Sequence, residues 1–184
     1  PGAPTLLGLH FTEARYFEAL GDYESAALDL EGTCEQARLA LGTWHALTAD
    51  CMQQYGVLLA RGGDLPGALD VLGEVVAIRT GVLGETALPT LSTGIDLAML
   101  QRQAGDFDGA LSSLETVAAG MIDPDSDALL APLAESRARV FFDLGKIDEA
   151  MESARFAYEL REAELGAEHP LSIDALNLIG GVRF

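Results

Sequence analysis

The sequence predicts an all-α protein, a right-handed superhelix that forms a solenoid of antiparallel helix pairs. The first observation is a six-residue pattern that begins with glycine, ends with alanine and occurs four times in 184 residues. Its glycines are Gly21, Gly63, Gly105 and Gly145, so successive copies lie 42, 42 and 40 residues apart. The second observation is apolar spacing typical of helices on both sides of each copy. A fixed period of this length indicates a helical-repeat array.

Each copy of the pattern has the composition of a tight turn between two helices. Glycine adopts the left-handed conformation that commonly ends a helix. In three copies the next residue is aspartate (Asp22, Asp64 and Asp106), which can cap the following helix, whereas Lys146 stands there in the fourth. The final alanine is small enough for two helices to cross closely. We therefore expect these alanines in the core: Ala26, Ala68, Ala110 and Ala150.

The helices are expected in pairs along the chain. The first pair begins near Thr5, and its second helix covers about 22–41. Later pairs are expected near 47–61 and 65–83, near 89–103 and 107–119, and near 129–144 and 147–165. A further first helix covers about 170–184. The repeats thus occupy about 5–42, 43–84, 85–126, 127–166 and, in part, 167–184, and we interpret residues 1–184 as one domain.

The linkers between repeats also match one another. Residues 42–48 align with residues 166–172, which places His45 and His169 three residues after a helix-ending glycine in both linkers. Residues 84–90 form a longer copy without histidine. A catalytic histidine needs a partner within reach, and the linkers offer none. Their equivalent positions instead predict a turn-and-cap role for both histidines.

With these motifs the chain resembles tetratricopeptide repeats of the long, kinesin-light-chain-like kind. The Gly-Asp-aromatic-x-x-Ala hinge, the Leu-Gly-x-x-His-Pro-like linkers and the period of about 42 residues carry the resemblance over nearly the whole chain. Departures are Gly67 and Gly109, where glutamate is usual, and the linker at Pro124, which lacks Leu-Gly. The resemblance implies a non-catalytic protein–protein interaction module whose first helices line a concave groove for peptides or partner helices.

Counting back from each hinge glycine projects the groove residues of these first helices. They are mostly polar or charged, and each complete repeat contributes one arginine. The projected set is Arg15, Gln53, Gln54, Arg61, Asp96, Met99, Arg102, Glu135, Arg139, Phe142 and Asn177. An arginine can hold a carboxylate through two parallel hydrogen bonds, so we expect Arg61 and Arg102 to anchor a ligand. The alternative is that the arginines pair internally with Glu18, Asp96 and Glu135.

Composition restricts the partners. The chain has 29 acidic and 11 basic side chains, a formal net charge of −18, which disfavours nucleic acid and anionic membranes. No run of 18 apolar residues and no signal peptide is present, and we predict a cytoplasmic protein. Cys34 and Cys51 lie beside apolar residues in expected helices. We interpret them as buried, reduced side chains, with a disulfide as the alternative.

No motif predicts an enzyme, a metal or a cofactor. Residues 123–127 (Asp-Pro-Asp-Ser-Asp) resemble the start of a calcium loop, but Ala128 and Ala134 stand where such a loop needs glycine and a bidentate glutamate. We expect a solvated turn there. The signatures of zinc proteases, nucleophile-elbow hydrolases and phosphate-binding loops do not occur.

Two functions remain. The first is the binding arm of a larger bacterial signalling or regulatory protein that holds a protein partner in its groove. The alternative is a receptor whose superhelix changes curvature when it binds a short signalling peptide. Asparagine-rich grooves suit the receptor, and only Asn177 among the projected residues is asparagine. Residues 171–184 are largely apolar, so we expect either a continuing chain or self-association through this helix.

Overall fold

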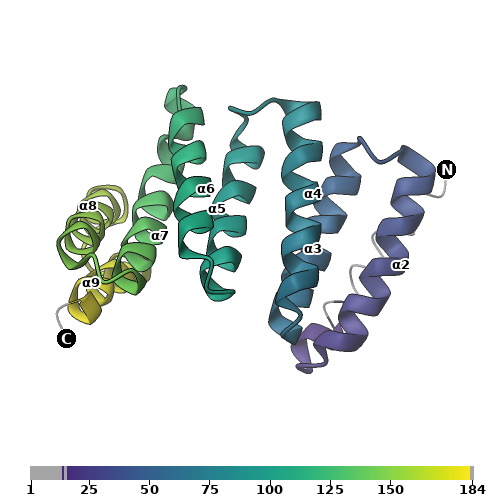
Figure 1. Cartoon of the computed structure of the whole chain (residues 1–184), viewed down its shortest axis with the longest axis horizontal. Helices are drawn as coiled ribbons and strands as arrows, with labels where there is room; N and C mark the ends of the chain where they lie inside the picture. The colour runs from purple at the N-terminus through teal and green to yellow at the C-terminus, as the bar shows by residue number, and fades with distance from the viewer. Residues whose placement is uncertain (1–13, 15, 183–184) are drawn as a thin grey trace. The chain divides into compact units, whose positions relative to one another are not determined.

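A computed structural model of the chain describes Ala14 and residues 16–182, except for the side chain of Val182. All regular structure in this part is helical (Figure 1). The elements are α2 (Tyr23–Leu41), α3 (Ala46–Gly62), α4 (Leu65–Leu83), α5 (Leu88–Gln103), α6 (Phe107–Gly120), the 3-10 helix η1 (Pro124–Leu129), α7 (Leu130–Asp143), α8 (Ile147–Leu165) and α9 (Pro170–Val182). The helices predicted from residue 22 onward are confirmed, with ends that differ by one or two residues. The first helix of the first pair, expected from near Thr5, lies largely outside the described residues.

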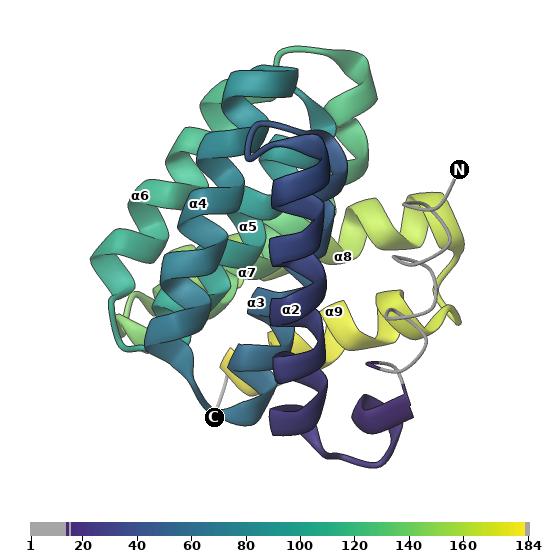
Figure 2. The same cartoon turned by 90° about the vertical axis from the view of Figure 1, so that its right-hand side faces the viewer.

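The chain divides into two compact units, Pro1–Thr93 and Gly94–Phe184, with the boundary inside α5. In the first unit α3 packs against both α2 and α4, and Figures 1 and 2 show the three as neighbouring helices. In the second unit α7 packs against α6 and α8, and α9 packs against α8. The prediction of a single domain over residues 1–184 stays a prediction.

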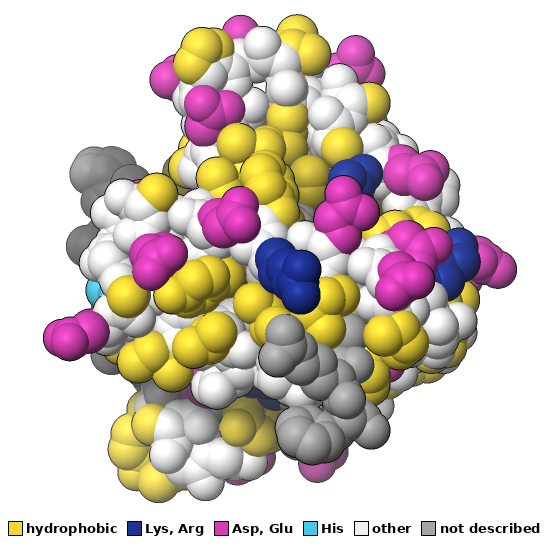
Figure 3. Space-filling model, turned by 90° about the vertical axis from the view of Figure 1, so that its left-hand side faces the viewer, with side chains coloured by type: hydrophobic (Ala, Val, Ile, Leu, Met, Phe, Trp, Pro, Cys, Tyr) yellow, Lys and Arg dark blue, Asp and Glu magenta, His cyan; other side chains and the backbone are white. Residues whose placement is uncertain are grey.

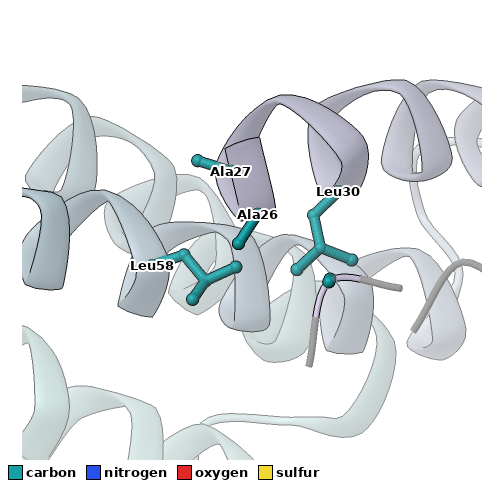
Figure 4. Close-up of a cluster of buried hydrophobic side chains, with 5 residues drawn as sticks. Ala26, Ala27, Leu30 and Leu58 are labelled. Carbon is teal, nitrogen blue, oxygen red and sulfur yellow. The ribbon is translucent and has the colours of Figure 1, made fainter. Parts of the chain in front are cut away.

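The helix crossing in the first unit is built from small and branched side chains. Ala26, Ala27 and Leu30 of α2 meet Leu58 of α3, and all four are buried (Figure 4). Ala26 is fully buried, and so are the equivalent Ala68, Ala110 and Ala150. The predicted core position of the hinge alanines is therefore confirmed, because only a methyl group fits where the two helix backbones approach.

The hinge turns fold as predicted. The four hinge glycines have φ values of +75°, +91°, +83° and +72° in chain order, which is the left-handed region. The carboxylates of Asp22, Asp64 and Asp106 accept hydrogen bonds from the backbone N–H three residues on, at 3.1, 3.0 and 2.9 Å. Hydrogen bonds from Ser25 lower the pKa of the Asp22 carboxyl. Lys146 makes no such cap.

Three linkers share one side-chain hydrogen bond, called here the hydroxyl clasp, which the sequence analysis did not predict. In each, a buried Ser or Thr in the first turn of a helix donates to the carbonyl of the helix-ending glycine six residues earlier. The bonds are Thr48 to Gly42 (2.9 Å), Thr90 to Gly84 (2.9 Å) and Ser172 to Gly166 (2.8 Å). The clasp ties the end of one repeat to the start of the next. It satisfies a carbonyl that the helix leaves without a partner.

The predicted cap role of the linker histidines is confirmed. Nδ1 of His45 accepts from the N–H of Leu47 at 3.1 Å, and Nδ1 of His169 accepts from the N–H of Leu171 at 3.3 Å. The linker at Pro124 forms η1 instead of a Leu-Gly turn, and α7 begins immediately after it. No group of three potential metal ligands occurs among the described residues.

The cysteines correct the sequence interpretation. Cys34 of α2 and Cys51 of α3 form a disulfide, with Cα atoms 5.5 Å apart, rather than two reduced side chains. Both residues are buried. Their separation of 17 residues gave no sequence signal, because they face each other only once α2 and α3 pack side by side. The disulfide alternative is the correct one.

The last helix exposes much of its apolar surface. Ser172 and Ala175 are buried, whereas Leu171, Ile173 and Leu176 are 42, 44 and 50 % exposed. Figure 3 views the molecule from the end where α8 and α9 lie, and hydrophobic side chains stand at its surface among acidic ones. This agrees with the predicted shortage of polar surface on the last helix. Self-association through it stays a proposal.

Ala110→Leu should destabilise the second unit by about 1–3 kcal/mol, because the larger side chain overpacks a fully buried crossing. Urea unfolding followed by circular dichroism measures the loss. The matched control is Ala119→Leu on the same helix, where the side chain is exposed and the unfolding midpoint should hardly move. Equal midpoints for the two variants would contradict the close crossing.

Reducing the Cys34–Cys51 disulfide should lower the free energy of unfolding by about 3 kcal/mol, since the bond closes a short loop in the unfolded chain. Urea unfolding with and without dithiothreitol measures the change. The variant Cys34→Ser with Cys51→Ser should have the same urea unfolding midpoint with and without dithiothreitol. Two free thiols in the non-reduced protein would contradict the bond.

Candidate functional site

The side of α3 that was predicted to line the groove, with Gln53, Gln54 and Arg61, is open to solvent. The buried residues of α3 include Thr48, Ala49, Cys51 and Met52, which face the neighbouring helices. The predicted residues point elsewhere on the same helix: Gln53 is half-buried, and Gln54 and Arg61 are exposed. Gln53 makes an interaction within the protein. The first helix of the pair therefore presents polar side chains on the side away from its core.

Arg61 and Arg102 both form ion pairs with acids of a neighbouring repeat. Arg61 Nη1 contacts Glu18 Oε1, as the internal-pairing alternative predicts. Arg102 Nη1 donates to Asp143 Oδ2 at 2.6 Å, and both side chains are about three-quarters buried. The predicted partner Asp96 also makes an interaction within the protein.

The two ion pairs occupy the same repeat positions with their charges exchanged. Glu18 and Arg102 each lie three residues before a hinge glycine, and Arg61 and Asp143 each lie two residues before the next one. The sequence analysis did not predict Asp143 as a partner, because it paired the arginines only within a helix or with a projected groove residue. Comparing positions before each hinge would have found it.

Glu135 also forms an ion pair, with an arginine of the same helix pair. Arg161 Nε of α8 donates to Glu135 Oε1 of α7 at 3.0 Å, and both side chains are largely buried. Arg79 of α4, equivalent to Arg161 in the repeat, is buried in the same way and bonds Asp50 of α3 at 2.5 Å and the hydroxyl of Thr93. A buried arginine of the second helix thus holds an acid of the first helix in both units.

Arg139 and Phe142 are groove residues of the second unit that are open to solvent. They lie one turn apart on α7, Arg139 is exposed, and Phe142 is 41 % exposed. Arg139 makes no ion pair within the part of the chain that the structure describes. Met99 on α5 is half-buried, and Asn177 on α9 is exposed. Arg15 lies outside the described residues.

The fold and this face define a class: an all-α solenoid with a polar, partly aromatic surface on its first helices. The Tetratricopeptide repeat family model matches residues 48–86 and 135–171. No curated protein matches the chain in sequence. The two matched segments fall in different units and each spans most of one helix pair.

Solved structures share the fold. Nearly identical TPR-like repeats of a candidate kinesin light chain from Podosopora anserina are 21 % identical, with a TM-score of 0.79 over 99 % of this chain and 87 % of that one. BtubC (BKLC) from P. vanneervenii is 16 % identical, with a TM-score of 0.81 over 98 % of this chain and 72 % of that one. MamA from Desulfovibrio magneticus RS-1 is 16 % identical, with a TM-score of 0.63 over 96 % of this chain and 93 % of that one.

Two segments of the chain thus match tetratricopeptide repeats, and its fold is similar to that of kinesin-light-chain-like repeat structures, as the resemblance predicts. Its predicted fold class, an all-α solenoid of antiparallel helix pairs, is confirmed. None of the described helices is long and apolar enough to cross a membrane.

Exchanging the charges of Arg102 and Asp143 should preserve stability, whereas each single reversal should not. Arg102→Asp and Asp143→Arg each place like charges together, and each should cost about 1 kcal/mol for a partly buried pair. A double-mutant cycle by urea unfolding measures the coupling. Simple additivity of the two single effects would contradict a direct pair, and the coupling should weaken at high salt.

Proposed function

We propose that this protein is a non-catalytic protein–protein interaction module that holds a segment of a partner protein along its first helices. The tetratricopeptide-repeat fold is generally a protein–protein interaction module. The observation that carries the proposal is the open surface of α7, where an exposed Arg139 without an ion pair among the described residues adjoins an exposed Phe142. Aromatic and arginine side chains are the types that most often dominate binding energy at protein interfaces.

The chemistry of this surface favours a partner segment with one apolar and one acidic side chain. Phe142 offers apolar area, and the Arg139 guanidinium can hold a carboxylate through two hydrogen bonds. Arg61 and Arg102 are proposed as further anchors. A ligand carboxylate there competes with Glu18 or Asp143, so each should contribute less than Arg139.

The biological setting is part of the proposal. We infer a binding arm of a larger bacterial signalling or regulatory protein. The predicted cytoplasmic location stays a prediction, and the Cys34–Cys51 disulfide counts against it, because such bonds persist mainly in oxidising compartments. A change in solution scattering when a short peptide binds would favour the peptide-receptor alternative.

Peptides selected for binding from a random displayed library should lose about tenfold or more in affinity for the variant Arg139→Ala with Phe142→Ala, because loss of a central anchor costs over about 1.4 kcal/mol. Isothermal titration measures the affinities. The matched control is Arg155→Ala with Phe156→Ala, the same residue types exposed on α8, a second helix.

The control should leave affinity nearly unchanged. If the α8 variant loses as much as the α7 variant, or if neither loses affinity, binding along the first helices is wrong. Arg61→Ala with Arg102→Ala, measured with the same peptides, tests the weaker anchors.

A further inference from the structure

A second groove lies in the first unit, on the opposite side of α3 from the predicted face. It has a volume of about 540 Å³, with walls from α2 and α4 and a floor that includes Met52 and Tyr55 of α3. Because an α-helix turns about 100° per residue, Met52 and Tyr55 point away from the side that carries Gln54 and Arg61. The groove and the face of the proposed function are therefore separate surfaces.

The α2 wall of this groove combines an apolar side chain, two acids and a glycine. Leu28, Glu31, Gly32 and Glu35 line it at helical spacing, and Leu28 is 70 % exposed. A Cβ added to Gly32 would meet nothing within 4 Å, so no packing contact requires glycine there. Glycine inside a helix is unfavourable relative to alanine. Its effect here is to leave the groove open.

The groove carries excess negative charge. Its three acids are Glu31, Glu35 and Glu74, and its one cation is Arg38. Arg38 bonds Glu74 at 3.1 Å and lies 3.8 Å from Glu35. Glu31 makes no ion pair within the described residues. Burial raises the pKa of the Tyr55 phenol on the floor, and the nearby charges of Glu31 and Asp64 raise it further.

The disulfide holds the wall of the groove to its floor. Cys34 lines the groove, and its bond to Cys51 joins α2 to α3. The shape of the groove is therefore covalently fixed on one side. A preformed groove with one wall held in place loses little conformational entropy when a ligand enters.

We propose that this groove binds a cationic amphipathic helix of a partner protein. An apolar side chain of that helix packs between Leu28 and Met52, and its lysine or arginine side chains pair with Glu31 and Glu35. Charge complementarity supports the assignment, and a helix laid in an apolar groove between two helices is a common mode of recognition.

The equivalent groove of the second unit offers an internal comparison. It lies between α6 and α8 over α7 and has a volume of about 520 Å³. Arg137 lines it without an ion pair among the described residues, and Lys146 Nζ lies 5.8 Å from the ring centre of its Phe141. Lys146 does not line the groove itself, so Arg137 is set against Glu149 and Glu152 there. The second groove should therefore favour a cation less than the first, which has three acids and one cation.

The test uses two synthetic peptides that place leucine on one helical face and either lysine or glutamate on the other. Isothermal titration with the oxidised protein should show binding of the lysine peptide and not of the glutamate peptide. Glu31→Gln with Glu35→Gln should weaken binding about tenfold, as expected for loss of interface anchors. Glu159→Gln with Glu164→Gln on α8 removes the same net charge and should change affinity far less.

A second variant pair tests the shape of the groove at constant charge. Gly32→Leu should fill the groove and abolish binding of the lysine peptide. Gly73→Leu on α4 is the matched control, because a Cβ added there also meets nothing within 4 Å and Gly73 does not line the groove. Circular dichroism checks that both variants keep their helical content.

The outcomes separate this groove from the proposed function. Arg139→Ala with Phe142→Ala should leave binding of the lysine peptide intact. Equal losses for the two glutamine pairs would show general attraction to an acidic protein and overturn the proposal. Equal losses for the two leucine variants, or unchanged binding by Gly32→Leu, would overturn it as well.

Discussion

The close helix crossing at each hinge is the constraint on which the rest of the structure depends. A glycine in the left-handed region turns the chain, an aspartate caps the next helix in three of the four hinges, and a fully buried alanine lets the two helices meet. The geometry requires a small side chain at that point and polar capping groups beside it. The crossings set how the two helices of each pair pack, and the linkers with their hydroxyl clasps join one pair to the next.

Charge has two roles in this protein. Most acids are exposed and give the chain its net charge of −18. A smaller set is held in pairs that join helices: Glu135 to Arg161 inside a helix pair, and Glu18 to Arg61 and Asp143 to Arg102 between repeats. The arginines are therefore largely committed to the fold. Of the predicted groove arginines that the structure describes, Arg61 and Arg102 are paired and Arg139 is not, which is why Arg139 carries the proposed function.

Each unit has two kinds of surface with different chemistry. The first helices present polar side chains, with an exposed aromatic ring on α7, whereas the second helices enclose grooves over the opposite side of a first helix. These grooves follow from the repeat, because each forms where two second helices pass over one first helix. The charges of the two grooves, however, are not fixed by the repeat. The acidic groove and the mixed-charge groove occupy the same repeat position in different units.

The sequence by itself determined the helix pairs, the hinges and the buried alanines, because glycine, aspartate and alanine recur at a period that only one local geometry satisfies. It also predicted the cap role of His45 and His169, which depends on neighbours two residues away. The tertiary structure decided contacts between residues far apart in the chain. The Cys34–Cys51 disulfide, the Arg102–Asp143 pair and the acidic groove all require two or three helices to be packed before their side chains meet. Single residues carry no local signal for such meetings, so only the packed helices reveal them.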